Sequence, residues 1–283
     1  MDIEYRSSVS AVMCVKNSGD SIIEAIESIL LNKPLELIVV DGDSTDSTIE
    51  KLQAYPEVIQ LSDRKLGLAH ARNLGASAAK GKYVLFVGPD NILPVGFIEN
   101  FLYLKNSGGL NAACVKTRIQ SPKTYWDRGQ DFRWRCLADE ESRGSIVVGT
   151  PSLYDKKIFD IENFSHKNLG PNDDTEFCDR LVKRGFKLGQ VNLIVFEKSG
   201  ANFLDLWKRY KWYGTGDYFY FMSGKEGWRW KRKMLSITHP VRQFIRYLWA
   251  TVKTGEVSYI PWLFCILSAR YYGWISMVLR KKT

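Results

Sequence analysis

Three groups of carboxylates stand out in this 283-residue sequence because each adjoins an element that apolar patterning predicts. Asp41-Gly42-Asp43-Ser44-Thr45-Asp46 follows the apolar run 37–40, and Gly88-Pro89-Asp90-Asn91 follows the run 83–87. The third group is Asn172-Asp173-Asp174-Thr175-Glu176. Carboxylates bind hard divalent cations or act as general bases. Helix capping explains one or two of these residues, but not six consecutive polar or glycine residues after a buried strand.

The elements around these groups predict an α/β fold. Apolar runs at 9–15, 35–40, 58–61 and 83–87 alternate with helical patterns at 21–31, 47–54, 66–79 and 173–184. Continuously apolar strands separated by helices predict a mostly parallel sheet with helices on both faces, and such sheets bind ligands at the carboxyl ends of their strands. Residues 118–145 show no apolar period, so we expect a surface loop that orders over a ligand. Ordered structure is expected to resume over 146–154.

Other chemistries find little support in the sequence. No GxGxxG follows a strand, the glycines of 75–82 lack Walker A spacing, and HExxH, GxSxG and metal-spaced Cys/His sets are absent. The three histidines show no partner pattern, and five cysteines without a CxxC pair indicate reduced thiols. The N-terminal MDIEYRSS has no apolar core, so no signal peptide is expected. Carboxylates therefore remain the candidate chemistry.

Four segments in order resemble a known family. They are Val12 to Asn17, then VVDGDSTDST, GLAHARNLGASAAKGKYVLFVGPDN and DDTEFCDRLVKRGFKL, and together they are similar to family 2 inverting glycosyltransferases of the GT-A (Rossmann-like) fold. The resemblance covers roughly residues 8–215. It implies transfer of a sugar from a UDP- or GDP-linked donor with the help of Mg²⁺ or Mn²⁺.

The resemblance also implies a nucleotide-sugar site. Asp41 matches the carboxylate that hydrogen-bonds the nucleotide base, in a pocket lined by Val15 and Asn17, and Asp43 belongs to the same motif. The segment 67–73 would run beneath the nucleotide, with Arg72 facing phosphate.

The metal site and the base are implied in the same way. Asp90 matches the last carboxylate of the DxD motif, which holds the metal on the diphosphate, although Gly88 stands where the first Asp is usual. Glu197 lies where many relatives have a His, so it is a candidate second metal ligand. Asp174 matches the catalytic base, and acidic neighbours such as Asp173 should raise its pKa. These acids would also favour the start of a helix, and the two roles are compatible.

Charge and tryptophan concentrate after residue 203. Residues 1–203 hold 25 Lys+Arg and 27 Asp+Glu (25 − 27 = −2), whereas residues 204–283 hold 15 and 4 (15 − 4 = +11) with seven of the nine tryptophans. Within 206–216, LWKRYKWYGTG resembles a degenerate QxxRW motif of processive, membrane-bound relatives, in a minimal cellulose-synthase-like arrangement. That resemblance makes Arg209, Lys211 and Trp212, with Asp173, candidates for holding the diphosphate or the acceptor. An amphipathic helix with snorkelling lysines is an equal alternative.

The basic, aromatic segments 228–233 and 240–253 precede SYIPWLFCILSARYYGWISMVL at 258–279, whose one charge is Arg270. A 22-residue helix would be about 33 Å long, enough for a bilayer core. A charge near its middle is costly, and Pro261, Gly273 and internal aromatic residues favour a helix lying in the interface over one that spans. The segment shows no nucleic-acid-binding signature, so a membrane partner is expected rather than nucleic acid.

The sequence therefore predicts two domains. Residues 1–203 would form the GT-A catalytic domain, and 204–283 would form basic, Trp-rich helices at the cytoplasmic face of the cell membrane. The expected function is inverting transfer of a sugar to a lipid-linked acceptor, a polyprenyl phosphate or diphosphate glycan. Transfer to a soluble or polysaccharide acceptor is one alternative, and a non-catalytic protein that binds nucleotide sugars or membranes is the other.

Overall fold

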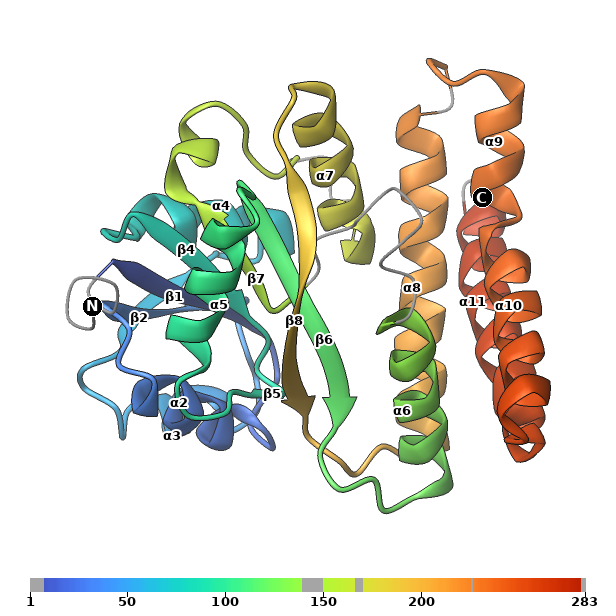
Figure 1. The fold of residues 1–283 in the computed structure, drawn as a ribbon, viewed down its shortest axis with the longest axis horizontal. Helices are drawn as coiled ribbons and strands as arrows, with labels where there is room; N and C mark the ends of the chain where they lie inside the picture. Colours follow the sequence, from blue (N-terminus) through green and yellow to red (C-terminus); the bar gives the residue numbers. More distant parts are fainter. Residues whose placement is uncertain (1–7, 139–149, 166–169, 225, 281–283) are drawn as a thin grey trace. The chain divides into compact units, whose positions relative to one another are not determined.

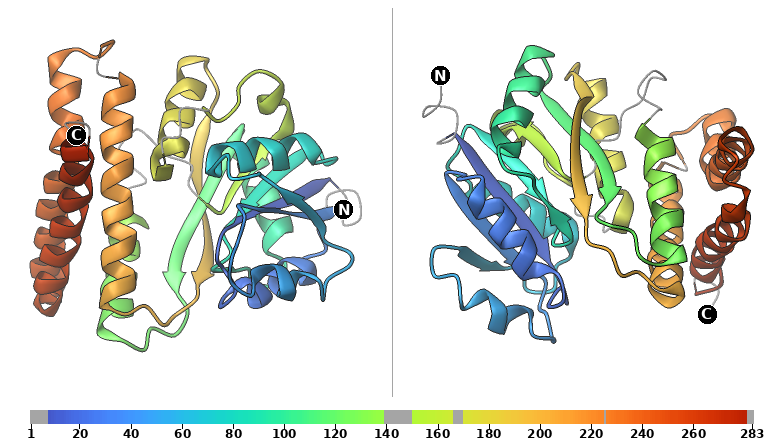
Figure 2. Two further views of the ribbon diagram at one scale, coloured as in Figure 1. Left: turned by 180° about the vertical axis from the view of Figure 1, so that it is seen from behind. Right: turned by 60° about the horizontal axis from the view of Figure 1, so that its bottom comes forward.

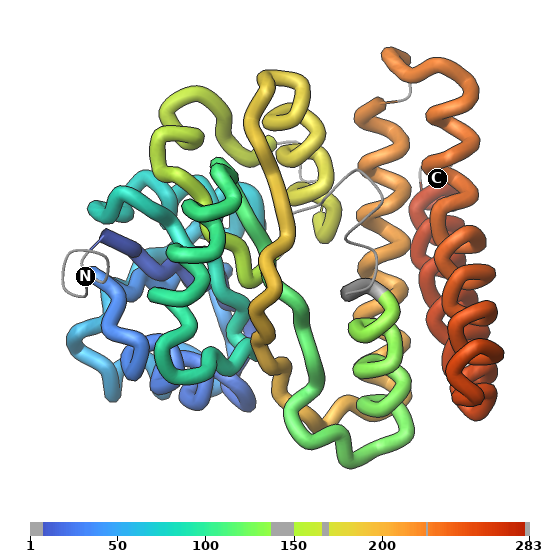
Figure 3. Tube along the Cα trace, viewed as in Figure 1, coloured from blue at the N-terminus to red at the C-terminus, as the bar shows by residue number. Residues whose placement is uncertain are grey.

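The computed structural model describes residues 8–138, 150–165, 170–224 and 226–280. The chain folds into two compact units. The sheet unit comprises residues 1–120, 141–166 and 174–198, and the helical unit comprises residues 121–140, 167–173 and 199–283. The functional boundary that the sequence predicts at residue 203 stays a prediction. Figure 1 gives the labels used below, and the tube in Figure 3 follows the course of the chain through each unit.

The sheet unit is built on a mixed sheet in the order β3-β2-β1-β4-β7-β6-β8-β5. The pairs β1–β2, β1–β4, β2–β3 and β6–β8 are parallel, whereas β7 and β5 pair antiparallel with their neighbours. The strands are β1 (Val9–Val15), β2 (Glu36–Asp41), β3 (Ile59–Ser62), β4 (Tyr83–Val87), β5 (Asn91–Ile92), β6 (Ala112–Ile119), β7 (Ser152–Asp155) and β8 (Leu188–Glu197).

Helices cover both faces of this sheet, as the sequence predicts (Figure 2). One face packs on α2 (Ile22–Leu31), α3 (Thr48–Leu52) and α5 (Phe97–Ser107). The other packs on α4 (Leu68–Ala78), the 3₁₀ turn η1 (Lys156–Asp160) and α7 (Asp173–Lys183). Because side chains alternate along a strand, Met13 of β1 lies in the first core and Val12 in the second. Strands buried on both faces explain the continuous apolar runs in the sequence.

The helical unit consists of five helices and two short 3₁₀ turns in the part of the chain described. They are α6 (Tyr125–Ala138), η2 (Gly170–Asn172), α8 (Phe203–Gly224), α9 (Trp230–Ile237), α10 (His239–Thr254), η3 (Val257–Tyr259) and α11 (Ile260–Arg280). Helices α8 and α11 approach closely at two glycines. A Cβ on Gly214 would lie 1.8 Å from the Arg270 carbonyl oxygen, and one on Gly273 would lie 2.0 Å from the Lys211 carbonyl oxygen. Small residues of this kind let helix backbones come into contact.

The prediction of a loop over 118–145 is wrong for residues 125–138, which form helix α6. Residues 139–149 lie outside the described part of the chain. The apolar period is missing because the inward face of α6 is largely polar: Asp127, Gln130 and Asp131 are buried beside Phe132. The Asp127 carboxylate accepts hydrogen bonds from the backbone N–H groups of Gly200 and Ala201, at 3.1 and 2.9 Å. Burial alone would raise the pKa of Asp127, but these and neighbouring hydrogen bonds lower it overall.

Residues 260–279 of the apolar segment lie in the continuous helix α11, unbroken at Gly273, and residues 258 and 259 belong to the short turn η3. Residues 257–280 are long and apolar enough to cross a membrane, and Trp262, Leu263 and Ala269 are buried within the helical unit. Arg270, the one charge within this segment, donates two hydrogen bonds to the Asp217 carboxylate of α8, with Nη2 2.8 Å from Oδ1. A buried partner thus compensates this charge without a membrane interface.

Candidate active site

Three of the predicted nucleotide-binding residues, Val15, Asp41 and Asp90, lie at one edge of the sheet. Strands β2, β1 and β4 are adjacent and parallel, so their carboxyl ends coincide. Val15 pairs with Asp41, and Met13 pairs with Val87, the residue before the Gly88-Pro89-Asp90 turn. The fold therefore brings together two of the three acidic groups found in the sequence.

Asp41 and Asn17 hold the loop after β2. Asp41 is 9% exposed, and its carboxylate accepts hydrogen bonds from the Ser44 hydroxyl at 2.6 Å and the Ser44 N–H at 3.0 Å. Asn17, in the left-handed region with φ 53°, accepts a hydrogen bond from the Thr45 N–H at 2.8 Å. Its backbone N–H donates to the Ser44 hydroxyl at 2.8 Å. These contacts preorganise a polar loop beside the end of β1.

A pocket of about 240 Å³ opens beside Asp41. Its lining combines apolar side chains with polar groups at the ends of β2 and β3: Val39, Asp41, Ile49, Leu52, Gln60, Leu61 and Ser62. A flat apolar ring with polar edges fits such a lining.

The other two acids of this cluster, Asp46 and Asp43, make different contacts. Asp46, which precedes the N-cap residue Ser47 of α3, accepts hydrogen bonds from the Thr48 N–H at 3.0 Å and the Gly19 N–H at 2.9 Å. Hydrogen bonds from Thr48 and Gly19 lower its pKa. Asp43, with φ 63°, forms an exposed ion pair with Lys65 at 2.9 Å. Asp46 is thus bound locally at the start of α3, whereas Asp41 and Asp43, with their contacts to Ser44 and Lys65, remain the candidates for binding a nucleotide.

The turn after β4 holds Gly88 at the position where the DxD pattern of the family has its first Asp. The buried Asn91 accepts a hydrogen bond from the Gly88 N–H at 2.9 Å, which closes the turn. A Cβ at position 88 would lie 2.8 Å from the Asp90 Oδ1 atom and 3.0 Å from the Asn91 Oδ1 atom. A side chain at this position would therefore require the Asp90 and Asn91 side chains to shift. This role of Asn91 was not predicted from the sequence.

Glu197 ends β8 next to this turn. Asn91 of β5 pairs with Glu197, and the Lys198 N–H donates to the Asp90 carbonyl oxygen at 2.9 Å. Asp90 and Glu197 thus belong to neighbouring chain segments, whereas no group of three or more His, Cys, Asp or Glu side chains able to hold a metal occurs within the described ranges. Two carboxylates with phosphate and water as further ligands suit Mg²⁺, which keeps several waters and rarely sits in an all-protein cage.

Arg72 and Asp174 are linked through an aromatic cluster. The Arg72 guanidinium, 9% exposed, lies 5.2 Å from the centre of the Phe164 ring, and Phe164 lies 4.2 Å from Phe177 of α7. Burial raises the pKa of Tyr154 well above its usual value. Cys178 and Asp174 raise this pKa further by smaller amounts, and Arg72 lowers it. Phe164 and Phe177 thus connect Arg72 of α4 with helix α7, whose first turn holds Asp174.

Asn73 fixes this arrangement through contacts that were not predicted from the sequence. The Asn73 side chain accepts a hydrogen bond from the Phe164 N–H at 2.8 Å and donates one to the Phe164 carbonyl oxygen at 2.9 Å. At the start of α7, the half-buried Asp174 accepts a hydrogen bond from the Thr175 N–H at 2.6 Å, while Asp173 is 1% exposed. The roles predicted for Asp174 and Asp173 stay predictions.

The remaining candidates lie on α8 in the helical unit. The Lys211 Nζ atom is 5.1 Å from the centre of the Tyr272 ring of α11, and Trp212 is 45% exposed. Arg209 is half-buried. Their predicted contact with diphosphate or acceptor stays a prediction.

Comparisons with known proteins agree with this architecture. A family model described as glycosyl transferase family 2 matches residues 10–164. Glycosyltransferase GlyG of Streptococcus pneumoniae is 34% identical over 181 residues, which are 56% of this chain and 60% of that protein. The chain thus spans less than two thirds of this relative's length.

Two solved structures share the fold at low identity. TarS of S. aureus matches with a TM-score of 0.51 at 13% identity, over 94% of this chain and 54% of that chain. A glucosyl-3-phosphoglycerate synthase from Mycobacterium tuberculosis, in complex with Mg²⁺ and UDP, matches with a TM-score of 0.51 at 16% identity, over 77% of this chain and 78% of that chain.

Proposed function

We propose that this chain, which belongs to glycosyl transferase family 2 and has the GT-A fold, transfers a sugar with inversion from a nucleotide-diphosphate donor to a lipid-linked acceptor. The shared strand edge supports the donor part of this proposal. Val15 and Asp41 end the adjacent parallel strands β1 and β2, and Asp90 lies in the turn after β4. Ligands bind at such edges in open α/β sheets.

Each residue at the edge has a part in this proposal. Asp41 accepts hydrogen bonds from the N–H groups of a uracil or guanine base lying in the pocket beside it. Val15 and Asn17 border that base, and Asp43 borders the nucleotide at the exposed end of the loop. Arg72 lies beneath the diphosphate, where a guanidinium forms charge-assisted hydrogen bonds to phosphate.

Asp90, with Glu197, would hold Mg²⁺ or Mn²⁺. When bound, the cation neutralises the phosphates and helps the nucleoside diphosphate to leave. For an acceptor that presents a hydroxyl, as a diphosphate glycan does, Asp174 accepts its proton as that oxygen attacks the anomeric carbon, the usual role of a general base. The phosphate oxygen of a polyprenyl phosphate is already ionised and needs no base. Asp173, Arg209, Lys211 and Trp212 are assigned to the acceptor or the diphosphate.

The acceptor half rests on the surface of α10. Its residues Val241, Ile245, Trp249 and Val252 are 37%, 58%, 65% and 58% exposed, and spacings of four, four and three place them on one face. Arg242, Arg246 and Lys253 flank this row. An exposed apolar row with basic flanks is typical of a helix that lies in an anionic membrane surface. We therefore assign the chain to the cytoplasmic face of a membrane and its acceptor to a polyprenyl phosphate or diphosphate glycan.

Calorimetric titration with UDP and GDP, with and without Mn²⁺, tests the donor site. We expect one nucleotide to bind, with affinity that depends on the metal and is lost in Asp90→Ala. Asp160→Ala, which removes an exposed carboxylate of the same unit, is the matched control and should bind as the wild type does. Equal nucleotide affinity in Asp90→Ala and the wild type would contradict the assignment of Asp90 to the metal-dependent donor site.

Flotation with phosphatidylglycerol vesicles tests the acceptor side. Trp249→Glu should float less than the wild type, whereas Thr254→Glu, at the exposed end of the same helix, should float nearly as well. Equal flotation of Trp249→Glu would refute this surface. Transfer to a soluble or polysaccharide acceptor, or nucleotide binding without transfer, are the alternatives that a transfer assay with each acceptor separates.

A further inference from the structure

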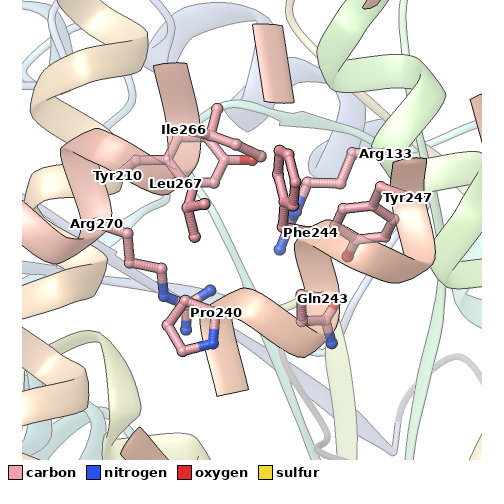
Figure 4. Close-up of a pocket in the computed structure, with 9 residues that line it drawn as sticks. All are labelled: Arg133, Tyr210, Pro240, Gln243, Phe244, Tyr247, Ile266, Leu267 and Arg270. Carbon is pink, nitrogen blue, oxygen red and sulfur yellow. The ribbon is translucent and has the colours of Figure 1, made fainter. Parts of the chain in front are cut away.

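A hollow inside the helical unit carries two arginines that the donor site does not use. It is lined by residues of α6, α8, α10 and α11, all of them described: Arg133, Tyr210, Pro240, Gln243, Phe244, Tyr247, Ile266, Leu267 and Arg270. Figure 4 shows Arg133 and Arg270 entering from opposite sides of the view, with their nitrogen atoms directed inward. This lining contains two guanidinium groups and no carboxylate.

The charges around the hollow are predominantly positive. Asp217 forms a two-point ion pair with Arg270 and accepts a third hydrogen bond from the Asn172 amide at 3.1 Å, so its oxygens are engaged. Arg133 lies 5.6 Å from the centre of the Tyr210 ring. Burial lowers the pKa of His239 to about 4, with Arg270 as the next cause, so this imidazole is neutral at pH 7. A guanidinium pair in an environment with little water favours an oxyanion, which accepts several N–H bonds at once.

Gln243 adds a polar group with open capacity. The amide nitrogen lies 3.4 Å from the His239 Nε2 atom, and the buried amide oxygen has no hydrogen-bond partner among the described residues. With the His239 proton on Nε2, the Gln243 amide rotated by 180° accepts a hydrogen bond from that N–H through its oxygen atom. The Gln243 NH₂ group then points into the hollow. Tyr210 is not available in this way, because its hydroxyl donates to the Gln130 side chain at 3.0 Å.

Apolar side chains form the rest of the lining. Phe244, Ile266 and Leu267 stand beside the arginines, and Phe264 of α11, 54% exposed, lies 4.8 Å from the ring centre of Phe244. The hollow is about 20 Å³, room for roughly one oxygen-sized group. A bound oxyanion would therefore insert one oxygen between the arginines and keep the rest of its molecule at the apolar mouth.

We propose that this hollow receives one oxygen of a phosphate group carried on an apolar chain. The Arg133 charge, with the Arg270 guanidinium that Asp217 already pairs, selects the phosphate. Phe244 and Leu267 of the lining contact the chain, and Phe264 lies beside Phe244. Under the proposed function, on which this step alone rests, the site would hold the phosphate of the lipid-linked acceptor.

Calorimetric titration of the full chain with dodecyl phosphate, below its micelle concentration, tests the site. We expect saturable binding that Arg133→Gln weakens at least about tenfold, since one charge-assisted pair contributes about 1.5–3 kcal/mol. Arg128→Gln removes the same charge from an exposed position on the same helix and should bind as the wild type does. Arg133→Lys, which keeps the charge but loses the planar fork, should lie between them. Circular dichroism checks that each variant is folded.

Two further ligands separate the phosphate from the chain. Inorganic phosphate and dodecanol should each bind at least about tenfold more weakly than dodecyl phosphate. Equal affinity for inorganic phosphate would overturn the apolar part of the proposal, and equal affinity for dodecanol would overturn the phosphate part. Absence of saturable binding, or equal binding by folded Arg133→Gln and wild type, would overturn the site. UDP titration of the same variants reports on the donor site, so the two proposals fail separately.

Discussion

The charged groups that the proposals depend on lie in different places in the two units. In the sheet unit the acidic residues assigned to ligands follow strands, at an edge that the parallel pairing of β2, β1 and β4 creates. In the helical unit the polar groups that organise the packing are inside: the ion pair of Asp217 with Arg270, the Asp127 carboxylate bonded to the loop 199–201, and the neutral His239 beside Gln243. Backbone topology thus positions the first site, whereas buried pairing between distant side chains organises the second unit.

The largest expected effect belongs to the sheet unit. Asp174→Asn removes the proposed base without changing size, so we expect transfer to fall about 10²- to 10⁴-fold while UDP or GDP affinity stays within about twofold. Single-turnover assays with a radiolabelled donor and nucleotide titration give the two readouts, with Asp160→Asn as the control. An active Asn variant would mean that the acceptor oxygen is already ionised, as in a phosphate, and would remove Asp174 from the mechanism.

The next effect tests the buried pair of the helical unit. Asp217→Ala leaves the Arg270 guanidinium, with a side chain 14% exposed, without its carboxylate, so we expect the free energy of unfolding to fall by about 3–5 kcal/mol. Asp205→Ala, at an exposed position of α8, should cost less than about 0.5 kcal/mol.

A double variant sharpens this result. Asp217→Leu with Arg270→Met should recover most of the lost stability, because an apolar pair of similar volume avoids the desolvation of both charges. Urea unfolding followed by circular dichroism gives all of these values. If the double variant were as unstable as Asp217→Ala, the pair would not be the source of the loss.

The contrast between the units also explains what the sequence could predict. The bounds predicted for β1 and β4 agree with the structure, because strands buried on both faces leave continuous apolar runs. The predicted end of β4 correctly places Asp90 in the turn after that strand. Strand β2 is predicted over 35–40 but runs over Glu36–Asp41, so Asp41 is its last residue. The resemblance to a family supplied roles for these residues that spacing alone does not reveal.

Contacts over long sequence separations escaped prediction. Asn73 binds Phe164 across 91 residues, and Asp217 binds Arg270 across 53. No local pattern marks either partner, since one Asn or Asp on a helix is ordinarily solvated. Helix α6 escaped for a related reason: its inward face carries Asp127 and Gln130, whose hydrogen-bond partners lie elsewhere in the chain. A polar inward face removes the period on which the prediction of a helix depends.

The pH dependence of stability should expose the interior of the helical unit. Burial depresses the pKa of His239 from its usual 6.5 to about 4, so the unfolded chain takes up this proton first as the pH falls. The stability due to neutral His239 is complete above pH 6.5 and is lost progressively as the pH falls to about 4, by about 3 kcal/mol in total.

Urea unfolding of the wild type and His239→Gln at pH 7.5, 6.5, 5.5 and 4.5 checks this. The difference in unfolding free energy between the two proteins should change by about 1 kcal/mol per pH unit below pH 6.5 and stay constant above it. A difference that does not vary with pH would show that His239 titrates normally and is not buried in a positive environment.

The smallest expected effect concerns the turn that departs from the family pattern. Gly88→Asp supplies the first carboxylate of a DxD motif, and charge alone would tighten Mn²⁺-dependent nucleotide binding. The Cβ at this position would lie 2.8 Å from the Asp90 Oδ1 atom, so the new side chain must displace the carboxylate that we assign to the metal. We therefore expect calorimetry to show affinity reduced about two- to fivefold, which is about 1 kcal/mol or less. Gly88→Ala has the same Cβ without the charge, and it should reproduce most of that loss. Binding at least tenfold tighter in Gly88→Asp would instead mean that Asp90 moves aside freely and that both carboxylates reach the cation.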